Sequence, residues 1–448
     1  MKYLIQNVLI INEGCSFTGS VLVDGEWIAA VYQGSEKPVE QIDAVRIDAT
    51  GKWLVPGAID DQVHFREPGY THKGTIETES CAAVAGGVTS FMDMPNTNPQ
   101  TTSLADLEWK FRRAAETSLA NYSFFFGGTN TNFHLIKQLD KKRIPGIKLF
   151  LGSSTGNMLV DKEETLRHFF GETDLLIAIH AEKEAIIQRQ KAYYLNMYGE
   201  EALDITFHSK IRNEEACYAS TAEAVALATS LGTRLHLLHL STAGELSLLE
   251  SDKPIHSKRI TAETCVHYLW FSDKDYPVFG NRIKWNPAIK TANDRLALRA
   301  AVNDNRMDIV ATDHAPHLLS EKEGNCLHAA SGAPMVQHSL VTMLELAYQG
   351  VFTKEKVVEK MAHHPAELFH INRRGFIRPG YYADLVLIDP QYQWTVSKEN
   401  ILYQCGWSPL EGQLFHHAIW KTFVNGRLVF SEGKVIKTGK GLELIFKN

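Results

Sequence analysis

The residues that could do chemistry stand at or near the ends of short apolar segments in this 448-residue chain. His64, His180 and His239 each close such a segment, Asp313 closes another, and Lys148 lies inside one. Neutral imidazoles and carboxylates bind zinc, and a catalytic zinc keeps one coordination position open for water. One polar residue at a strand end often only satisfies a loop, but so many together are difficult to assign to packing. The residue types therefore indicate a metal centre.

The spacing around the first histidine adds a detail. Side chains alternate along a strand, so Gln62, His64 and Arg66 share one face. His64 can therefore point toward the end of its strand with Arg66 just above it. The other candidate ligands come from other segments, and we expect all of them to converge at one rim.

Short apolar strands alternate with helical patterns through the middle of the chain, which is typical of a parallel sheet covered by helices. The predicted strands are residues 57–64, 90–96, 121–128, 146–152, 175–181, 234–241, 260–265 and 308–313. Helical patterns lie between most of them, for example over 104–118 and 220–231. Eight such units over residues 54–375 predict an α/β fold, a (β/α)8 barrel, in which the active site lies at the C-terminal ends of the strands.

The two ends of the chain have a different pattern. Residues 1–53 and 376–448 contain short β segments separated by turns, with hairpin signals at 24–25 (DG) and 425–426 (NG). Neither end is large enough to bury a good core alone. We therefore expect the two ends to pair as one small composite β-sandwich domain beside the barrel.

Composition excludes several classes of protein. The formal net charge of −6 gives no electrostatic footprint for nucleic acid. No uncharged apolar run approaches the roughly 18 residues of a membrane span, and the start of the chain lacks the apolar region of a signal peptide. Six scattered cysteines fit reduced thiols. These features predict a cytoplasmic protein without nucleic-acid or membrane partners.

Residues 60–69 (DDQVHFREPG) resemble the opening motif of dihydroorotases in the amidohydrolase superfamily. The resemblance covers nearly the whole chain. It continues in seven further segments: 86–89 (GGVT), 94–97 (MPNT), 239–242 (HLST), 284–287 (KWNP), 311–317 (ATDHAPH), 380–385 (GYYADL) and 424–426 (VNG). The segment 313–317 is specific to the cyclic-amide group of the superfamily, and the combination of 66–69 with 95–97 is more specific to dihydroorotases.

The resemblance implies a set of metal ligands. His64 and Asp313 would hold the more buried metal, and His180 and His239 would hold the second. Lys148 matches the lysine that many members carboxylate on its amine, which makes an anionic bridge between two metals. One or two Zn²⁺ ions per subunit are therefore expected.

The resemblance also implies a substrate and a reaction. The family interconverts N-carbamoyl-L-aspartate and L-dihydroorotate in pyrimidine synthesis. A metal-bound hydroxide attacks the ring carbonyl, and Asp313 takes the water proton and returns it to the leaving nitrogen as general base and then general acid. The residues expected to hold the substrate are Arg66, Asn96 and His317 for its free carboxylate, with Asn286 and the backbone of Gly332 and Ala333 for its ring edges.

One position departs from the family pattern. The family has His-x-His on the first strand, whereas this chain has Gln62 in place of the first histidine. A neutral amide oxygen is a poorer zinc ligand than imidazole. The more buried metal site is therefore expected to be weakened, filled by another metal or empty. Asp60 and Asp61 are candidates to compensate, although Asp61 faces the wrong way on an ideal strand.

Three readings of function stay open on the sequence. Another cyclic amidohydrolase, a hydantoinase or allantoinase, is the alternative within enzymes, and Arg66 with Asn96 argues against it because a guanidinium suits a carboxylate. An inactive dihydroorotase-like scaffold is favoured by Gln62 and opposed by the presence of the other predicted ligands.

The loop 153–157 is either a polar loop or a lid over the substrate. The resemblance suggests a homodimer.

Overall fold

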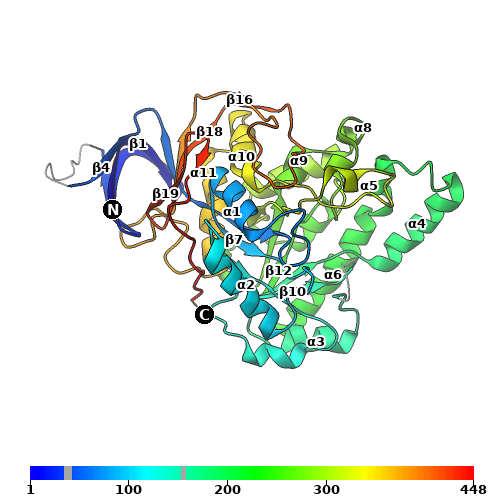
Figure 1. The fold of residues 1–448 in the computed structure, drawn as a ribbon. Helices are drawn as coiled ribbons and strands as arrows, with labels where there is room; N and C mark the ends of the chain where they lie inside the picture. The colour runs from blue at the N-terminus through cyan, green and yellow to red at the C-terminus, as the bar shows by residue number, and fades with distance from the viewer. Residues whose placement is uncertain (35–42, 153–157, 448) are drawn as a thin grey trace.

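A computed structural model describes residues 1–34, 43–152 and 158–447 of the chain. These residues form a barrel of parallel strands surrounded by helices, with a separate sheet at one side (Figure 1). The fold class predicted from the sequence is thereby confirmed. The loop at 153–157, predicted as a polar loop or a lid, lies outside the described residues.

The barrel strands are short and almost completely buried. They are β6 (Ala58–Val63), β7 (Val88–Asp93), β8 (Asn121–Phe124), β9 (Phe126–Gly127), β10 (Ile147–Phe150), β11 (Ile177–His180), β12 (Leu235–Leu237), β13 (Ile260–Cys265) and β14 (Ile309–Ala311). Burial on both faces explains why they read as apolar runs and not as alternating patterns. Each of the eight predicted strands is present, and the third is divided into β8 and β9.

The barrel closes between its first and last strands. The backbone N–H of His64 donates to the carbonyl of His314 at 2.7 Å, and Val63 forms a parallel bridge with His314. All other neighbouring barrel strands also pair in parallel. The carboxyl ends of all these strands consequently meet at one rim.

A β-bulge interrupts β6 close to that rim. Asp60 pairs with Phe91 and Val63 pairs with Asp93, so three steps along β6 match two along β7. A bulge leaves one residue unpaired and breaks the alternation of side chains. The direction of Asp61 is therefore not the one that an ideal strand would give.

Helices cover the outside of the barrel (Figure 1). They are α1 (Ile76–Ala85), α2 (Leu104–Thr117), α3 (Glu163–Gly171), α4 (Glu184–Tyr198), α5 (His208–Ile211), α6 (Glu214–Leu231), α7 (Val266–Trp270), α8 (Tyr276–Phe279), α9 (Ala292–Asn303), α10 (Ser339–Tyr348), α11 (Lys354–Val358) and α12 (His364–Leu368). The predicted helices at 104–118 and 220–231 correspond to α2 and the last two thirds of α6. In the described part of the chain, no helix combines the length and apolar character needed to cross a membrane.

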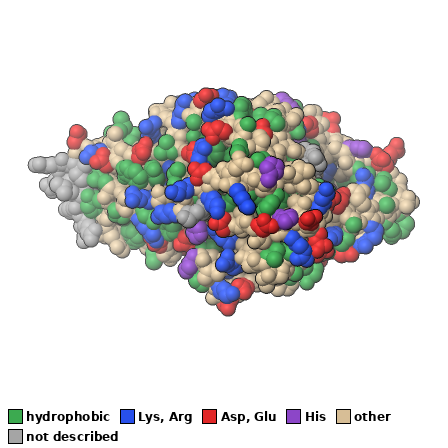
Figure 2. All heavy atoms as spheres, turned by 90° about the horizontal axis from the view of Figure 1, so that it is seen from below, with side chains coloured by type: hydrophobic (Ala, Val, Ile, Leu, Met, Phe, Trp, Pro, Cys, Tyr) green, Lys and Arg blue, Asp and Glu red, His purple; other side chains and the backbone are tan. Residues whose placement is uncertain are grey.

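The separate sheet joins the two ends of the chain. Its strands are β1 (Lys2–Asn12), β2 (Cys15–Asp24), β3 (Trp27–Gln33), β4 (Val45–Asp48), β5 (Trp53–Pro56), β15 (Leu385–Asp389), β18 (Ala418–Val424), β19 (Arg427–Ser431) and β20 (Lys434–Val435). The N-terminal β5 pairs antiparallel with the C-terminal β15 in the middle of the sheet. The short strands β16 (Trp394–Thr395) and β17 (Leu414–Phe415) pair separately. On the molecular face seen in Figure 2, basic and acidic side chains are interspersed.

Candidate active site

A cavity of about 370 Å³ opens at the carboxyl-terminal rim of the barrel. The structure brings ten predicted site residues to its wall: His64, Arg66, Asn96, Lys148, His180, His239, Asn286, Asp313, His317 and Gly332. Ala333 is not among the described lining residues. Its carbonyl instead accepts a hydrogen bond from the backbone N–H of Ala315 at 3.0 Å, so Ala333 pairs with the segment that follows β14.

Strand ends supply the chemical groups of the cavity. His64 follows β6 directly, and His180 is the last residue of β11. His239 and Asp313 each stand two residues beyond a strand, β12 and β14 respectively, and Lys148 lies within β10. The convergence of these five residues follows from parallel strands that end at one rim.

His64 and Asp313 form the first pair of potential ligands. His64 Nε2 lies 3.1 Å from Asp313 Oδ1, and His64 Nδ1 lies 2.7 Å from Asn96 Oδ1. With Nδ1–H donating to the Asn96 amide oxygen, the Nε2 lone pair faces the Asp313 carboxylate. Two lone-pair donors that face each other at this distance fit a shared cation.

His180 and His239 form the second pair. His180 Nδ1 lies 2.9 Å from His239 Nε2, and His180 Nε2 lies 3.0 Å from Glu182 Oε2. Burial lowers the pKa of both histidines, so both are neutral imidazoles, the form that binds a metal. Burial raises the pKa of Glu182, but Arg212 and His180 outweigh that effect and hold it at about 2. A carboxylate that orients the far nitrogen of a histidine is a common partner of metal ligands.

Lys148 is fully enclosed beside these pairs, 1% exposed, with its amine 4.7 Å from the centre of the Phe150 ring. Burial lowers the pKa of its amine to about 7, although Asp313 and Glu263 oppose the shift. A large part of the amine is therefore neutral near neutral pH. Neutral amine is the form that adds CO₂, so the position fits a carboxylated lysine.

Gln62 lines the same cavity, and its amide nitrogen lies 3.4 Å from Asp313 Oδ1. Its amide oxygen is buried and has no hydrogen-bond partner among the described residues. An orphaned buried oxygen next to two lone-pair donors fits a nearby cation. The described lining residues include neither Asp60 nor Asp61, so the suggestion that these aspartates replace the missing histidine finds no support.

Asp60 has a structural role instead. Its carboxylate accepts hydrogen bonds from the Oγ1 of Thr312 at 2.5 Å and from the backbone N–H of Thr312 at 3.2 Å. Burial raises the pKa of this carboxyl to about 8. Asp60 therefore fixes the backbone that leads to Asp313.

Cationic and amide groups occupy another part of the cavity wall. The Nε of Arg66 donates to the carbonyl of Pro316 at 2.9 Å, which anchors the guanidinium at the cavity. His317 Nδ1 lies 3.1 Å from Lys73 Nζ, and Lys73 forms an ion pair with Glu321. Burial together with Arg66 lowers the pKa of His317, which keeps this ring neutral. Because Glu321 balances the charge of Lys73 and His317 is neutral, the Arg66 guanidinium gives this wall a net positive charge. A positive wall favours an anionic ligand.

Two further groups at the cavity are shaped for a ligand. The side-chain oxygen of Asn286 is buried without a hydrogen-bond partner among the described residues. Gly332 has a φ of 118°, and a Cβ there would lie 2.7 Å from the carbonyl oxygen of Ala315. Glycine is therefore required at this position.

Backbone strain gathers at the candidate site. Arg66, His239 and Asp313 have φ values of 69°, 43° and 46°. Non-glycine residues rarely adopt positive φ, and such strain clusters at functional sites. All three residues line the cavity, which supports the interpretation of the cavity as the active site.

Sequence reasoning missed several lining residues. Tyr70, Lys73, Phe150, Trp285 and Ser331 also line the cavity. Lys73 had a signal, because it lies in the loop that follows the Arg66 motif. Glu182 was also missed, although it stands two residues after His180 in the sequence.

Known proteins resemble this chain over most of its length. The model of the amidohydrolase family matches residues 53–429. A protein named dihydroorotase from Methanosarcina acetivorans is 31% identical over 452 residues, which cover 98% of this chain and 94% of the relative. A second one from Methanosarcina mazei is 33% identical over 391 residues, covering 85% and 84%.

Solved structures share the fold. An L-hydantoinase (dihydropyrimidinase) from Arthrobacter aurescens superposes with a TM-score of 0.89 at 24% identity, covering 99% of both chains. A dihydropyrimidinase from Brevibacillus agri gives a TM-score of 0.87 at 24% identity, covering 97% of this chain and 96% of the other. At this level of identity the likeness concerns the fold alone.

Proposed function

This chain belongs to the amidohydrolase family, and we propose that it catalyses the dihydroorotase reaction, the interconversion of N-carbamoyl-L-aspartate and L-dihydroorotate. Its family and its relatives make it a hydrolase that acts on cyclic amides. The identity of the cyclic amide substrate, dihydroorotate, is what we propose here.

The cationic wall of the cavity supports this substrate most strongly. Dihydroorotate carries a carboxylate outside its ring, and Arg66 lines the same cavity as the paired histidines. Asn96 uses its oxygen to accept from His64, which leaves its two N–H donors for a ligand. A guanidinium and an amide together suit a carboxylate, which hydantoin lacks.

The chain's own residues have separate roles in this proposal. His64, Lys148, His180, His239 and Asp313 would hold the metal. A divalent metal there would supply Lewis-acid polarisation of the ring carbonyl and would acidify a water molecule. Asp313 takes the proton of the attacking water and delivers it to the ring nitrogen as the C–N bond breaks. Asn286 and the backbone of Gly332 orient the ring edges.

Several finer points belong to the same proposal. We propose zinc as the metal, N-carboxylation of Lys148, and a place in pyrimidine synthesis. We also propose a homodimer in the cytoplasm. The buried amine of Lys148 at the cavity supports its carboxylation, and the pathway follows from the proposed reaction.

Hydantoinase activity is the second candidate, because the solved structures with the same fold include hydantoinases. The two functions differ in the need for a carboxylate group on the substrate. Loss of the contact between the Arg66 guanidinium and the substrate carboxylate should therefore affect turnover of dihydroorotate and not turnover of hydantoin.

The test is steady-state turnover of dihydroorotate and of hydantoin by the wild-type protein and by Arg66→Lys. We expect dihydroorotate to be the substrate and its KM to rise about tenfold or more in Arg66→Lys, because a charge-assisted hydrogen bond is lost. Arg112→Lys, an exposed arginine on α2, is the matched control and should behave as wild type. Faster turnover of hydantoin that is insensitive to Arg66→Lys would identify a hydantoinase, and turnover of neither substrate would favour the inactive scaffold.

A further inference from the structure

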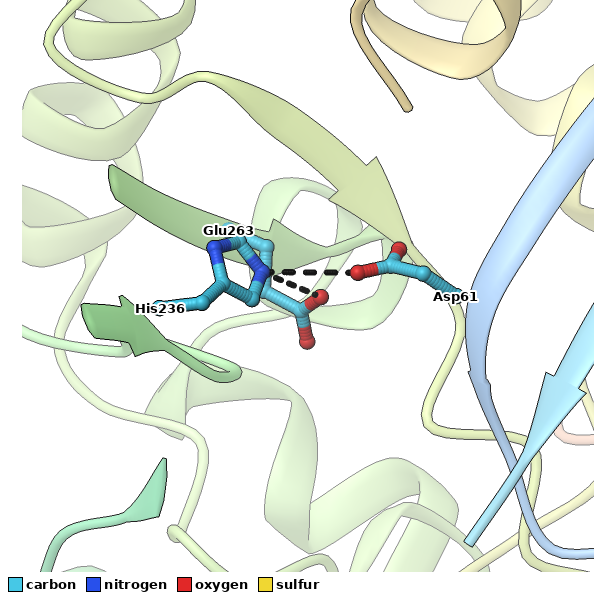
Figure 3. Close-up of side chains that lie close together, drawn as sticks. All are labelled: Asp61, His236 and Glu263. Atoms are coloured by element: carbon cyan, nitrogen blue, oxygen red, sulfur yellow. Dashed lines mark hydrogen bonds and ion pairs between the residues drawn. The ribbon is translucent and has the colours of Figure 1, made fainter. Parts of the chain in front are cut away.

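A second cluster of metal-competent side chains lies inside the barrel, outside the cavity described above. We propose that Asp61, His236 and Glu263 bind a divalent transition-metal ion, with zinc as the ion to test. One ligand atom from each residue lies within 4.8 Å of the other two. Figure 3 shows the three side chains pointing toward one another, each from a different barrel strand.

The fold explains why these three residues meet. Asp61 lies at the bulge of β6, which turns it into the barrel. His236 lies on β12, three residues before His239, and Glu263 lies on the adjacent β13. The three side chains are 0% exposed, so the cluster is closed to solvent. Closed sites of this kind hold structural ions, whereas catalytic sites keep an open position.

The distances suit coordination better than hydrogen bonding. His236 Nε2 lies 3.4 Å from Asp61 Oδ2 and 3.3 Å from Glu263 Oε2. Ligands about 2.0–2.1 Å from a tetrahedral zinc are about 3.3–3.4 Å apart. Hydrogen bonds from N–H to O are about 2.9 Å long. An ion bound by Nε2 and one oxygen of each carboxylate matches these two distances.

The far nitrogen of His236 sets the direction of its lone pair. His236 Nδ1 lies 2.9 Å from Thr261 Oγ1, and this hydroxyl donates to the carbonyl of Leu235 at 3.3 Å. Since the hydroxyl proton is used there, the oxygen accepts from Nδ1–H. In the neutral ring, Nε2 is then a bare lone pair that faces two carboxylates. Metal-binding histidines are oriented by a hydrogen bond of this kind.

Asp61 also lacks the partners that a buried charge requires. Both Asp61 oxygens are buried without a hydrogen-bond partner among the described residues. Glu263 uses Oε1 to accept from the backbone N–H of His239 at 3.1 Å, which leaves Oε2 facing His236. Buried carboxylates are paired or coordinate metals. A divalent cation would neutralise the two carboxylates, and through Glu263 it would support the backbone of His239.

The experiment is anomalous diffraction from crystals of the wild-type protein dialysed against zinc alone, with data collected on both sides of the zinc absorption edge. We expect a zinc peak between Asp61, His236 and Glu263, separate from any peak at the cavity. Absence of that peak, with zinc only at the cavity or nowhere, would overturn the proposal and leave a proton-sharing cluster. This outcome does not depend on which substrate the enzyme takes.

Metal content gives a second readout. Asp61→Asn, which keeps the shape of the side chain, should lose one zinc per chain relative to wild type. His64→Ala, which removes a cavity side chain that contacts Asn96 and Asp313, should keep the interior zinc peak. Equal zinc content in wild type and a folded Asp61→Asn would contradict the assignment.

Discussion

His64 and His180 each have one ring nitrogen committed to an acceptor, Asn96 and Glu182 respectively. That commitment fixes which nitrogen offers its lone pair to the cavity. The residues of the site therefore have two kinds of role. His64 and His180 would bind a metal, whereas Asn96 and Glu182 fix the tautomers of these histidines. Asn96 has both a positioning contact to His64 and free donors for a substrate.

Lys148 gives the first prediction at this scale. Protein prepared in ¹³C-bicarbonate should show a carbamate carbon resonance, because a buried neutral amine adds CO₂ with release of a proton. Lys148→Ala should abolish the resonance and nearly all activity. Lys360 is the matched control, a buried lysine away from the cavity whose pKa burial lowers to about 8. Lys360→Ala should retain the signal; a resonance that persists in Lys148→Ala would remove the carbamate from this position.

Gln62 gives the second prediction. Gln62→His should raise the metal content of the purified protein by up to one ion per chain without reducing activity, because imidazole is a better zinc ligand than a neutral amide oxygen. Plasma emission spectrometry after identical dialysis measures the difference. Gln188→His adds a histidine on the exposed face of α4 and controls for surface binding. An unchanged metal content would show that Gln62 does not limit occupancy.

At the scale of elements, a buried ion pair between β7 and α2 positions the loop that carries Arg66. Lys110 Nζ lies 2.6 Å from Asp93 Oδ2 and 2.9 Å from the carbonyl of Met94. Asp93 Oδ1 accepts from the backbone N–H of Phe65 at 2.7 Å. The helix, the strand end and the loop are thus joined through one carboxylate.

Lys110→Met should therefore lower the free energy of unfolding by about 3–5 kcal/mol, because it leaves the Asp93 carboxylate buried without its partner. Urea denaturation followed by tryptophan fluorescence measures the change. Lys141→Met removes the lysine of an exposed pair with Asp174 and should cost less than about 1 kcal/mol. An equal loss of unfolding free energy in the two variants would mean that the buried Lys110–Asp93 pair stabilises the fold no more than an exposed pair does.

At the scale of the whole molecule, the C-terminal segment ties the terminal sheet to the barrel. Leu444 and Phe446 pack in one hydrophobic cluster with Ile59 and Met92 of the barrel strands β6 and β7. Asp384 accepts hydrogen bonds from Asn121 at the start of β8 and from the backbone of Asn425. The two parts therefore share both apolar and polar contacts.

Leu444→Ala should consequently lower the free energy of unfolding by about 2–5 kcal/mol, the usual cost of a cavity at a buried leucine. The adjacent Ile445 is 45% exposed, so Ile445→Ala is a matched control with a small effect. Thermal unfolding of both variants gives the comparison. A destabilisation that is the same at both positions would show that the segment does not anchor in the barrel.

Much of this protein could be predicted from the sequence. Buried parallel strands are apolar throughout, so the eight barrel segments were visible as runs. Parallel strands end at one rim, so His64, His180, His239 and Asp313 could be grouped without knowing a single distance. The resemblance at residues 60–69 added the chemistry.

Tertiary structure decided the rest. The bulge in β6 turns Asp61 toward His236 and Glu263, against the alternation that the sequence predicts. Ala333 pairs with His314 beyond the end of β14 and does not line the cavity, and Lys73 enters the cavity wall from a loop. These outcomes depend on which side chains of distant segments come within hydrogen-bond range, which is set by register and bulges. Sequence periodicity fixes the face of an ideal element, whereas the partners on that face are fixed only when the elements pack.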